Sequence, residues 1–173
     1  MCLLPVFVAA CSVPATESPR PATELIVGVA EGNVPGAELG VGQFANLLSF
    51  ESLTNSSLAD GRVIPRLADR WTWENNDRRL RVHLLSNVFL HDGRRFSGDA
   101  AVQIVQNAVK NPLNLAKYPS LGDITAVTAD KEFEVVIDLS RPSAMLPEDL
   151  TVPLDVGPNA VGTGPYRVVE RGE

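Results

Sequence analysis

Residues 66–99, RLADRWTWENNDRRLRVHLLSNVFLHDGRRFSGD, contain the pattern that decides the fold. In 70–75 and again in 79–84, apolar and polar residues alternate, as they do in a β-strand with one buried face. Between these stretches lies Asn75-Asn76-Asp77, and residues of this kind tolerate the left-handed backbone of a tight turn. The sequence therefore predicts a β-hairpin with one apolar and one charged face.

A helix is predicted to follow, over residues 97–111. Ser97 suits the N-cap position, and Asp99 lies in the first turn, where the helix dipole favours a carboxylate. Pro112 is expected to end the helix. Four apolar residues recur at i, i+3, i+4 and i+7 and would form its buried stripe: Ala101, Ile104, Val105 and Ala108.

The rest of the chain supplies further short elements. A buried strand is predicted over 24–30 and a short helix over 43–50. A second hairpin is predicted over 123–139 with its turn at 129–131, and a last strand over 166–170. Hairpins and helices interspersed in this way indicate an α+β protein.

Length, charge and cysteine content restrict the classes of fold and function that the chain can have. The chain has 173 residues, 45% of them hydrophobic, and a net charge of −6. This length suits one ordinary domain. An acidic chain argues against nucleic-acid binding, which normally uses a basic face. Its two cysteines, Cys2 and Cys11, lie within the first dozen residues, so the sequence predicts no disulfide framework or cysteine-rich metal site downstream.

The N-terminus has the pattern of a processing signal. Residues 1–11 form an apolar stretch ending in Val8-Ala9-Ala10-Cys11, which resembles the bacterial lipoprotein signal, cleaved before a lipidated cysteine. Residues 12–23 (SVPATESPRPAT) then read as a Pro-, Ser- and Thr-rich tether. We therefore expect lipidation of Cys11 and a location on the periplasmic or extracellular face of the membrane. No Lys or Arg precedes Cys11, so a start further upstream, or a chance cysteine, stays open.

Several segments together resemble one protein family. They contain, in order, a Trp-containing strand, a second strand, an Asp-Gly turn that resembles the family's Phe-x-Asp-Gly turn, an aromatic residue, a small residue and an Asp that open a helix, a strand before a Pro-containing loop, and a Gly-Thr-Gly-Pro-Tyr turn. This order is similar to that of bacterial extracellular solute-binding protein family 5, the dipeptide, oligopeptide and nickel-binding proteins of ABC importers. The segments are 66–75 (RLADRWTWEN), 80–84, 88–99, 132–142 (EFEVVIDLSRP) and 161–166 (VGTGPY).

The resemblance implies both a fold and a function. Residues 24–173 would form the N-terminal portion of a two-lobed periplasmic-binding-protein fold, made of the proximal lobe and its inserted subdomain, with the second lobe missing. The function implied is capture of peptides and their delivery to an ABC permease, without catalysis or a cofactor. The glycine-rich loop after the first strand would line the cleft, which makes Glu38, Leu39, Gly40 and Val41 the expected ligand contacts. An ordinary mobile loop is the alternative.

Other functions stay open on the sequence. Within the same family, the ligand could be nickel or an oligosaccharide. From other classes, the chain could be a secreted hydrolase or a structural lipoprotein that uses its domain for partner contact. A hydrolase would need a nucleophile beside a base, and the sequence places no histidine next to a Ser or Cys motif.

A few residues resemble catalytic or binding groups. We expect His91-Asp92 to form a turn rather than a catalytic pair, and Trp71 and Trp73 to join the core rather than stack on a ligand. The spacing of His83 and His91 matches no zinc pattern, so no metal site is predicted. Five arginines, expected on a solvated face rather than in a basic patch, are Arg78, Arg79, Arg81, Arg94 and Arg95.

Overall fold

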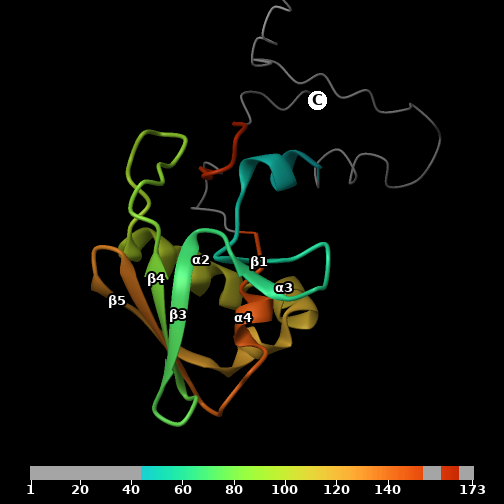
Figure 1. Cartoon of the computed structure of the whole chain (residues 1–173), viewed down its shortest axis with the longest axis vertical. Coiled ribbons are helices and arrows are strands. Elements are labelled where there is room, and N and C mark those ends of the chain that lie inside the picture. Colours follow the sequence, from blue (N-terminus) through green and yellow to red (C-terminus); the bar gives the residue numbers. More distant parts are fainter. Residues whose placement is uncertain (1–43, 154–160, 168–173) are drawn as a thin grey trace, which may run out of the picture. The chain divides into compact units, whose positions relative to one another are not determined.

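The computed structural model describes residues 44–153 and 161–167, which all belong to one unit of the chain, residues 33–173 (Figure 1). The predicted signal, tether, ligand loop and strand over 24–30 lie outside these residues. In the described part, helices and antiparallel strands intermingle along the chain, which confirms the α+β class.

The centre of the fold is a four-stranded antiparallel sheet in the order β3–β4–β6–β5. β3 (Ala68–Glu74) and β4 (Arg79–Leu84) form the first hairpin, as predicted. Asn75, Asn76 and Asp77 turn the chain with φ angles of 55°, 52° and 61°, so the left-handed turn is confirmed. Asn and Asp adopt this backbone more readily than other side chains because their short polar groups can hydrogen-bond locally.

The second hairpin turns later than predicted. β5 (Ile124–Lys131) and β6 (Glu134–Leu139) stay paired as far as Lys131 and Glu134, so the prediction of a turn at 129–131 is wrong. The physical reason lies in contacts with distant segments, because the turn at residues 132–133 is held where the carbonyl oxygen of Glu132 accepts the N–H of Gly98 at 2.7 Å and that of Phe133 accepts the N–H of Leu84 at 2.9 Å. A polar stretch that suits a turn is thereby kept in the strand.

Helix α2 (Gly98–Lys110) forms where the sequence predicts it. The Ser97 side chain accepts a hydrogen bond from a backbone N–H of the first turn, and the four stripe residues are all buried. α2 ends at Lys110, just before Pro112, which confirms the predicted end of the helix, and Pro112 then begins a separate helix, α3 (Pro112–Lys117), which Asn111 caps. Proline is tolerated at this position because the first N–H groups of a helix have no partner inside it.

Short elements occupy several connections. The pair β1 (Thr54–Ser56) and β2 (Val63–Pro65) forms a separate two-stranded sheet. A 3₁₀ helix, η1 (Pro119–Asp123), precedes β5, and α4 (Leu146–Asp149) follows β6. Each is too short to show a hydrophobic period, so the sequence does not predict them.

The chain ends of the described part agree only partly with expectation. Residues 44–49 form the predicted short helix. Residues 166–167, the start of the predicted last strand, are not in a strand, and the rest of that strand lies outside the description. A bilayer crossing would need a longer and more apolar helix than any found in the described ranges.

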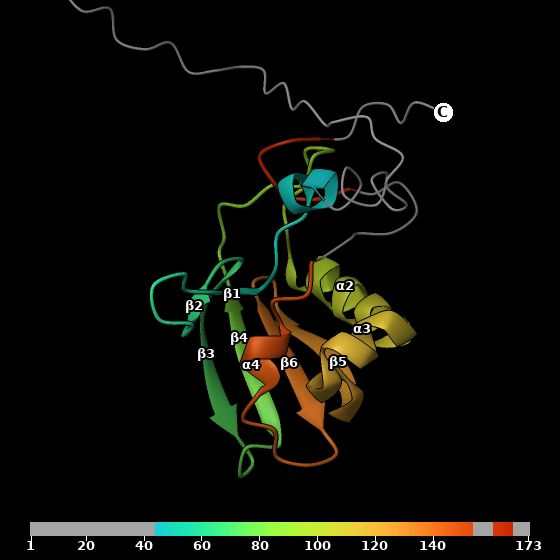
Figure 2. The same cartoon turned by 90° about the vertical axis from the view of Figure 1, so that its right-hand side faces the viewer.

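The hydrophobic core lies between the sheet and the helices. α2 contacts β5 and β6, and Figure 2 shows α2, α3 and α4 together on one side of the sheet. Phe96, just before α2, is fully buried in this cluster. Trp71 and Trp73 are half-buried and pack against it, which confirms that they belong to the core. The opposite face of the sheet carries charged side chains.

Candidate functional site

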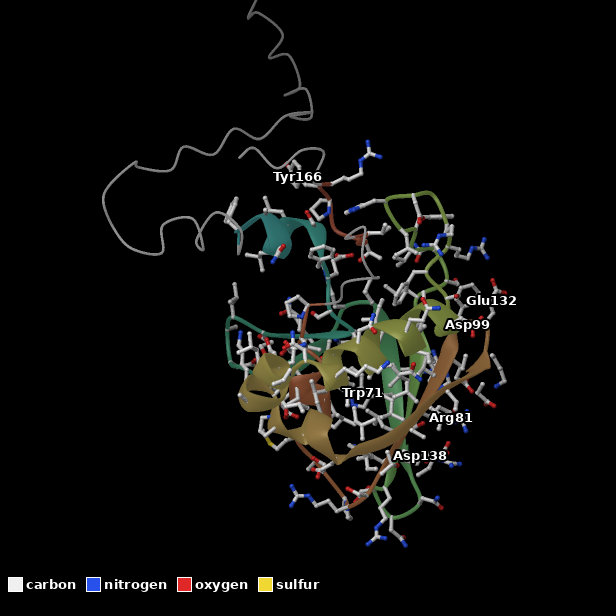
Figure 3. All side chains as sticks on the ribbon, turned by 180° about the vertical axis from the view of Figure 1, so that it is seen from behind. Trp71, Arg81, Asp99, Glu132, Asp138 and Tyr166 are labelled. Atoms are coloured by element: carbon white, nitrogen blue, oxygen red, sulfur yellow. The ribbon has the colours of Figure 1, made fainter. Side chains whose placement is uncertain are left out.

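Three segments far apart in the sequence meet around residues 161–166, which we call the strap. On one side, the strap backbone pairs with the end of the helix over 44–49, and Figure 3 shows Tyr166 close to this helix. On the other side lies the turn that contains His91. The backbone hydrogen bonds are Gly164 N–H to Ser49 O (3.0 Å), Tyr166 N–H to Leu48 O (3.2 Å) and His91 N–H to Gly162 O (2.9 Å).

The strap approaches the helix end closely because two of its residues have no side chain. A Cβ atom on Gly162 would overlap the carbonyl oxygen of Ser49 and lie 2.7 Å from the ring of Phe50. A Cβ atom on Gly164 would overlap the carbonyl oxygen of Leu48. Any other residue would force the two backbones apart, so the Gly-Thr-Gly pattern is a steric requirement of this contact.

The imidazole of His91 holds the strap from the opposite side. Its Nε2 lies 2.8 Å from the carbonyl oxygen of Gly164, and its Nδ1 accepts the N–H of Gly162 at 3.4 Å. Sequence reasoning missed this role, because 71 residues separate His91 from Gly162. The only signal was that both lie in motifs of the same resembled family.

Asp92 stabilises the turn in which it lies and does not form a catalytic pair with His91. Its carboxylate accepts the backbone N–H of Arg94 at 3.0 Å and the Nε of Arg94 at 2.7 Å. These backbone and side-chain hydrogen bonds lower the pKa of Asp92 from its ordinary value. Gly93 completes the turn with a φ of 84°. The interpretation of His91-Asp92 as a turn is therefore confirmed.

The face of the sheet that points away from the core carries charges of both signs. At its centre, Arg81 donates hydrogen bonds of 2.6 Å to the carboxylates of Glu74, Asp130 and Glu134. The hydrogen bonds raise the pKa of Arg81 and lower the pKa of Glu74 and of Asp130. We call these four residues the Arg81 cluster.

Three more of the five arginines, Arg79, Arg94 and Arg95, also pair with carboxylates, while Arg78 is exposed in the β3–β4 turn. Arg79 binds Asp138 through two hydrogen bonds of 2.6 and 3.2 Å, and Figure 3 shows Asp138 near Arg81 on the same part of the sheet. Arg94 pairs with Asp92, and Arg95 lies 3.6 Å from Glu132. The surface is therefore close to neutral locally, which agrees with the expected solvated face.

Glu134 is the buried member of the Arg81 cluster, with a side chain that is 7% exposed. Besides Arg81, it meets Nδ1 of His83 at 3.0 Å and Nζ of Lys131 at 3.3 Å. A pocket of about 280 Å³ lies beside it, lined by residues of β3, β4 and the β5–β6 turn. Three cationic or polar partners compensate the burial of this carboxylate, as a buried charge requires.

The predicted ligand and lipid sites lie elsewhere in the chain. Glu38, Leu39, Gly40 and Val41, and the lipidation residue Cys11, are outside the residues that the structure describes. In the described part, no group of three or more His, Cys, Asp or Glu side chains is placed to hold a metal ion. The described geometry therefore consists of a clamped strap and a charged, internally paired sheet face.

Comparison with known proteins identifies the family. The model of "Bacterial extracellular solute-binding proteins, family 5 Middle" matches residues 62–173, which is more than half of the chain. The chain belongs to this family. The match includes both hairpins of the four-stranded sheet, α2 and the strap, which carry the resemblance noted in the sequence. A search of curated proteins found no match.

Solved structures of family 5 type share the fold. They include NikZ from Campylobacter jejuni in complex with Ni(L-His), with 26% identity and a TM-score of 0.62, covering 73% of this chain and 28% of that chain. NikA from Brucella suis, in complex with Fe(III)-EDTA, has 21% identity and a TM-score of 0.66, covering 75% and 29%. DppA from Helicobacter pylori, in complex with the peptide STSA, has 14% identity and a TM-score of 0.60, covering 82% and 34%.

These matches confirm the predicted fold and the predicted family. The neighbours are two-lobed periplasmic binding proteins, and this chain corresponds to a partial piece of that fold. It spans 28% to 34% of the length of these three structures. The family and its neighbours are binding proteins rather than enzymes.

Proposed function

We propose that this chain is part of the substrate-binding component of an ABC importer, which captures peptides outside the cytoplasmic membrane and delivers them to the permease. The family 5 match over residues 62–173 carries the proposal. The fold shared with DppA, solved with the peptide STSA, supports a peptide as the cargo.

The contacts of the two histidines support binding rather than bond-making. In the described part, His91 is engaged by the strap backbone and His83 by Glu134. A general base must instead be within reach of the proton that it abstracts from a substrate or nucleophile. Neither histidine faces such a group, so the hydrolase alternative has no support from these residues.

The proposed ligand contacts are Glu38, Leu39, Gly40 and Val41. A glycine-rich rim can hold an extended peptide through main-chain hydrogen bonds while its side chains occupy tolerant pockets. Glu38 would pair with a cationic group of the peptide. This loop leads directly into the helix over 44–49, whose end is held by the strap.

We also propose that the protein is attached to the membrane by lipid on Cys11. Two or more acyl chains hold a protein stably at a bilayer, whereas one chain binds only reversibly. Replacing Cys11 by Ser is expected to move the protein from the membrane fraction to the soluble fraction and to abolish labelling by radioactive palmitate. Cys2→Ser is the matched control, and loss of membrane attachment in that variant instead would contradict the assignment to Cys11.

Isothermal titration calorimetry on the unmodified protein, expressed from its own gene and purified, tests whether the cargo is a peptide. We expect saturable binding heat with peptides of two to five residues. The variant Glu38→Gln should weaken binding of peptides with a free amino terminus by about tenfold, since a charge-assisted hydrogen bond contributes roughly 1.5–3 kcal/mol. Glu31→Gln, the same change earlier in the chain, should bind as the unmodified protein does. Peptide hydrolysis during the titration would favour the hydrolase, and no heat with any peptide would contradict the proposal.

Nickel is the second candidate cargo. The observation that favours it is the fold shared with NikZ, which was solved with Ni(L-His) and is 26% identical over the matched region. In the same calorimeter, Ni(L-His) should give heat and peptides should not. An oligosaccharide mixture as a third titrant distinguishes the remaining alternative within the family.

A further inference from the structure

The two ring nitrogens of His91 contact the strap backbone, and one arrangement of protons satisfies both contacts. Gly162 offers a backbone N–H to Nδ1 at 3.4 Å, so Nδ1 must be an unprotonated acceptor. Gly164 offers a carbonyl oxygen to Nε2 at 2.8 Å, so Nε2 must carry the proton and donate. These contacts assign the neutral imidazole with its proton on Nε2.

The backbone of His91 strengthens the same contact. Its N–H donates to the carbonyl oxygen of Gly162 at 2.9 Å, while its ring accepts the N–H of Gly162. One residue therefore binds both polar groups of Gly162. Because Nε2 of the ring also contacts the carbonyl oxygen of Gly164, His91 binds both ends of the Gly-Thr-Gly turn.

The strap depends on this partner because its two glycines have no side chains of their own to anchor it. On the helix side, Gly162 and Gly164 pack directly against the backbone of residues 48–50. On the other side, the described contacts of these glycines come from His91. The strap is thus held between a helix end and one imidazole.

His91 is itself held in position by its turn. Gly93 N–H donates to Leu90 O at 2.9 Å, and Leu90 N–H donates to Arg94 O at 2.8 Å. The Asp92 carboxylate accepts hydrogen bonds from the backbone N–H and the Nε of Arg94, which close the turn. Because its backbone is fixed in this way, His91 holds its ring in one place, and the ring in turn can hold the strap.

We infer that His91 is a positioning residue, which fixes the strap against the end of the helix over 44–49 through its Nε2–H tautomer. The inference goes beyond the proposed function and does not depend on the cargo. It predicts that the strap leaves the helix when the imidazole is lost, while the core around α2 stays intact.

The test combines nitrogen NMR of the unmodified chain with amide hydrogen exchange. In the unmodified chain, the Nε2 of His91 should carry a slowly exchanging proton, and Nδ1 should show the shift of an unprotonated nitrogen. In His91→Leu, the amides of Gly162, Gly164 and Tyr166 should exchange at least about tenfold faster. His91→Gln should keep most of the protection, because its amide retains one donor and one acceptor.

His83→Gln is the matched control, since His83 contacts Glu134 on the sheet rather than the strap. It should leave the strap amides unchanged. Unchanged strap exchange in His91→Leu, or a proton on Nδ1 in the unmodified chain, would overturn the inference. If His91→Leu does not fold, the tautomer of the unmodified chain together with exchange in His91→Gln decides the question.

Discussion

Arg81 illustrates how single residues on the outer sheet face neutralise one another. Its guanidinium donates hydrogen bonds to the carboxylates of Glu74, Asp130 and Glu134. The side chain of Glu134 is only 7% exposed. Removing one partner of a buried ion pair is costly because the remaining charge stays out of water without compensation. Arg81 therefore supports the fold more than its position on an outer face suggests.

This difference can be measured with three arginine variants. Arg81→Met is expected to lower the melting temperature more than Arg79→Met, because Arg81 binds three carboxylates and Arg79 binds Asp138 alone. Arg78→Met, at an exposed position of the turn, is the control and should leave the melting temperature nearly unchanged. Thermal unfolding followed by circular dichroism tests the ranking. Equal effects of Arg81→Met and Arg78→Met would contradict it.

The Arg81 cluster also predicts how stability depends on pH. Hydrogen bonds from Arg81 lower the pKa of Glu74 and Asp130 from ordinary values of 4.5 and 3.8. A carboxyl with a lowered pKa contributes stability that is complete above its unfolded pKa and is lost as the pH falls through its folded pKa. The unmodified chain should therefore lose stability below about pH 5 more steeply than Arg81→Met. Urea titrations at a series of pH values test this, and parallel pH profiles would argue against the cluster.

At the scale of elements, the β3–β4 turn places three successive residues in left-handed backbone. A β-branched side chain is strained in this region, so Asn76→Val should destabilise the chain by about 1–2 kcal/mol. Asn76→Gly should match or exceed the unmodified stability, because glycine adopts positive φ without strain. Urea unfolding of both variants measures the difference. A stable Asn76→Val variant would show that the turn does not have this backbone.

Helix α2 is held mainly by its buried stripe. Ile104 is 2% exposed in the core, whereas Gln106 on the same helix is exposed. Ile104→Ala should cost about 2–5 kcal/mol, since it removes buried methyl groups and leaves a cavity. Gln106→Ala should change stability by less than about 0.5 kcal/mol. Similar losses in both variants, measured by urea unfolding, would contradict the packing.

At the scale of the whole molecule, the strap connects segments that lie far apart in the chain. Gly164→Ala is expected to push the strap off the helix end, because its Cβ would overlap the carbonyl oxygen of Leu48. The amide of Tyr166 should then exchange at least about tenfold faster, while amides of α2 keep their protection. Thr163→Ala, between the two glycines, is the control and should leave exchange unchanged. Loss of protection throughout α2 would mean that the strap and the core unfold as one unit.

The local sequence pattern was enough to predict those strands and helices that form within a short stretch of the chain. Alternation over 70–75 and 79–84 and the helical stripe ahead of Pro112 both predicted elements that the structure contains. The order of the motifs also predicted the family, because such motifs mark successive parts of one fold. These features depend on neighbours a few residues apart, and that is the range over which backbone periodicity acts.

Tertiary structure decided what the same residues do once distant segments meet. Residues 129–131 remained in a strand because the hairpin turns at 132–133, where contacts with Gly98 and Leu84 hold the turn, and Pro112 begins a second helix directly after α2 has ended. His91 reads as a turn residue in the sequence, yet its ring holds a strap 71 residues away. Hydrogen bonds and steric contacts between remote segments leave no periodic trace in the chain, so only the folded arrangement shows them.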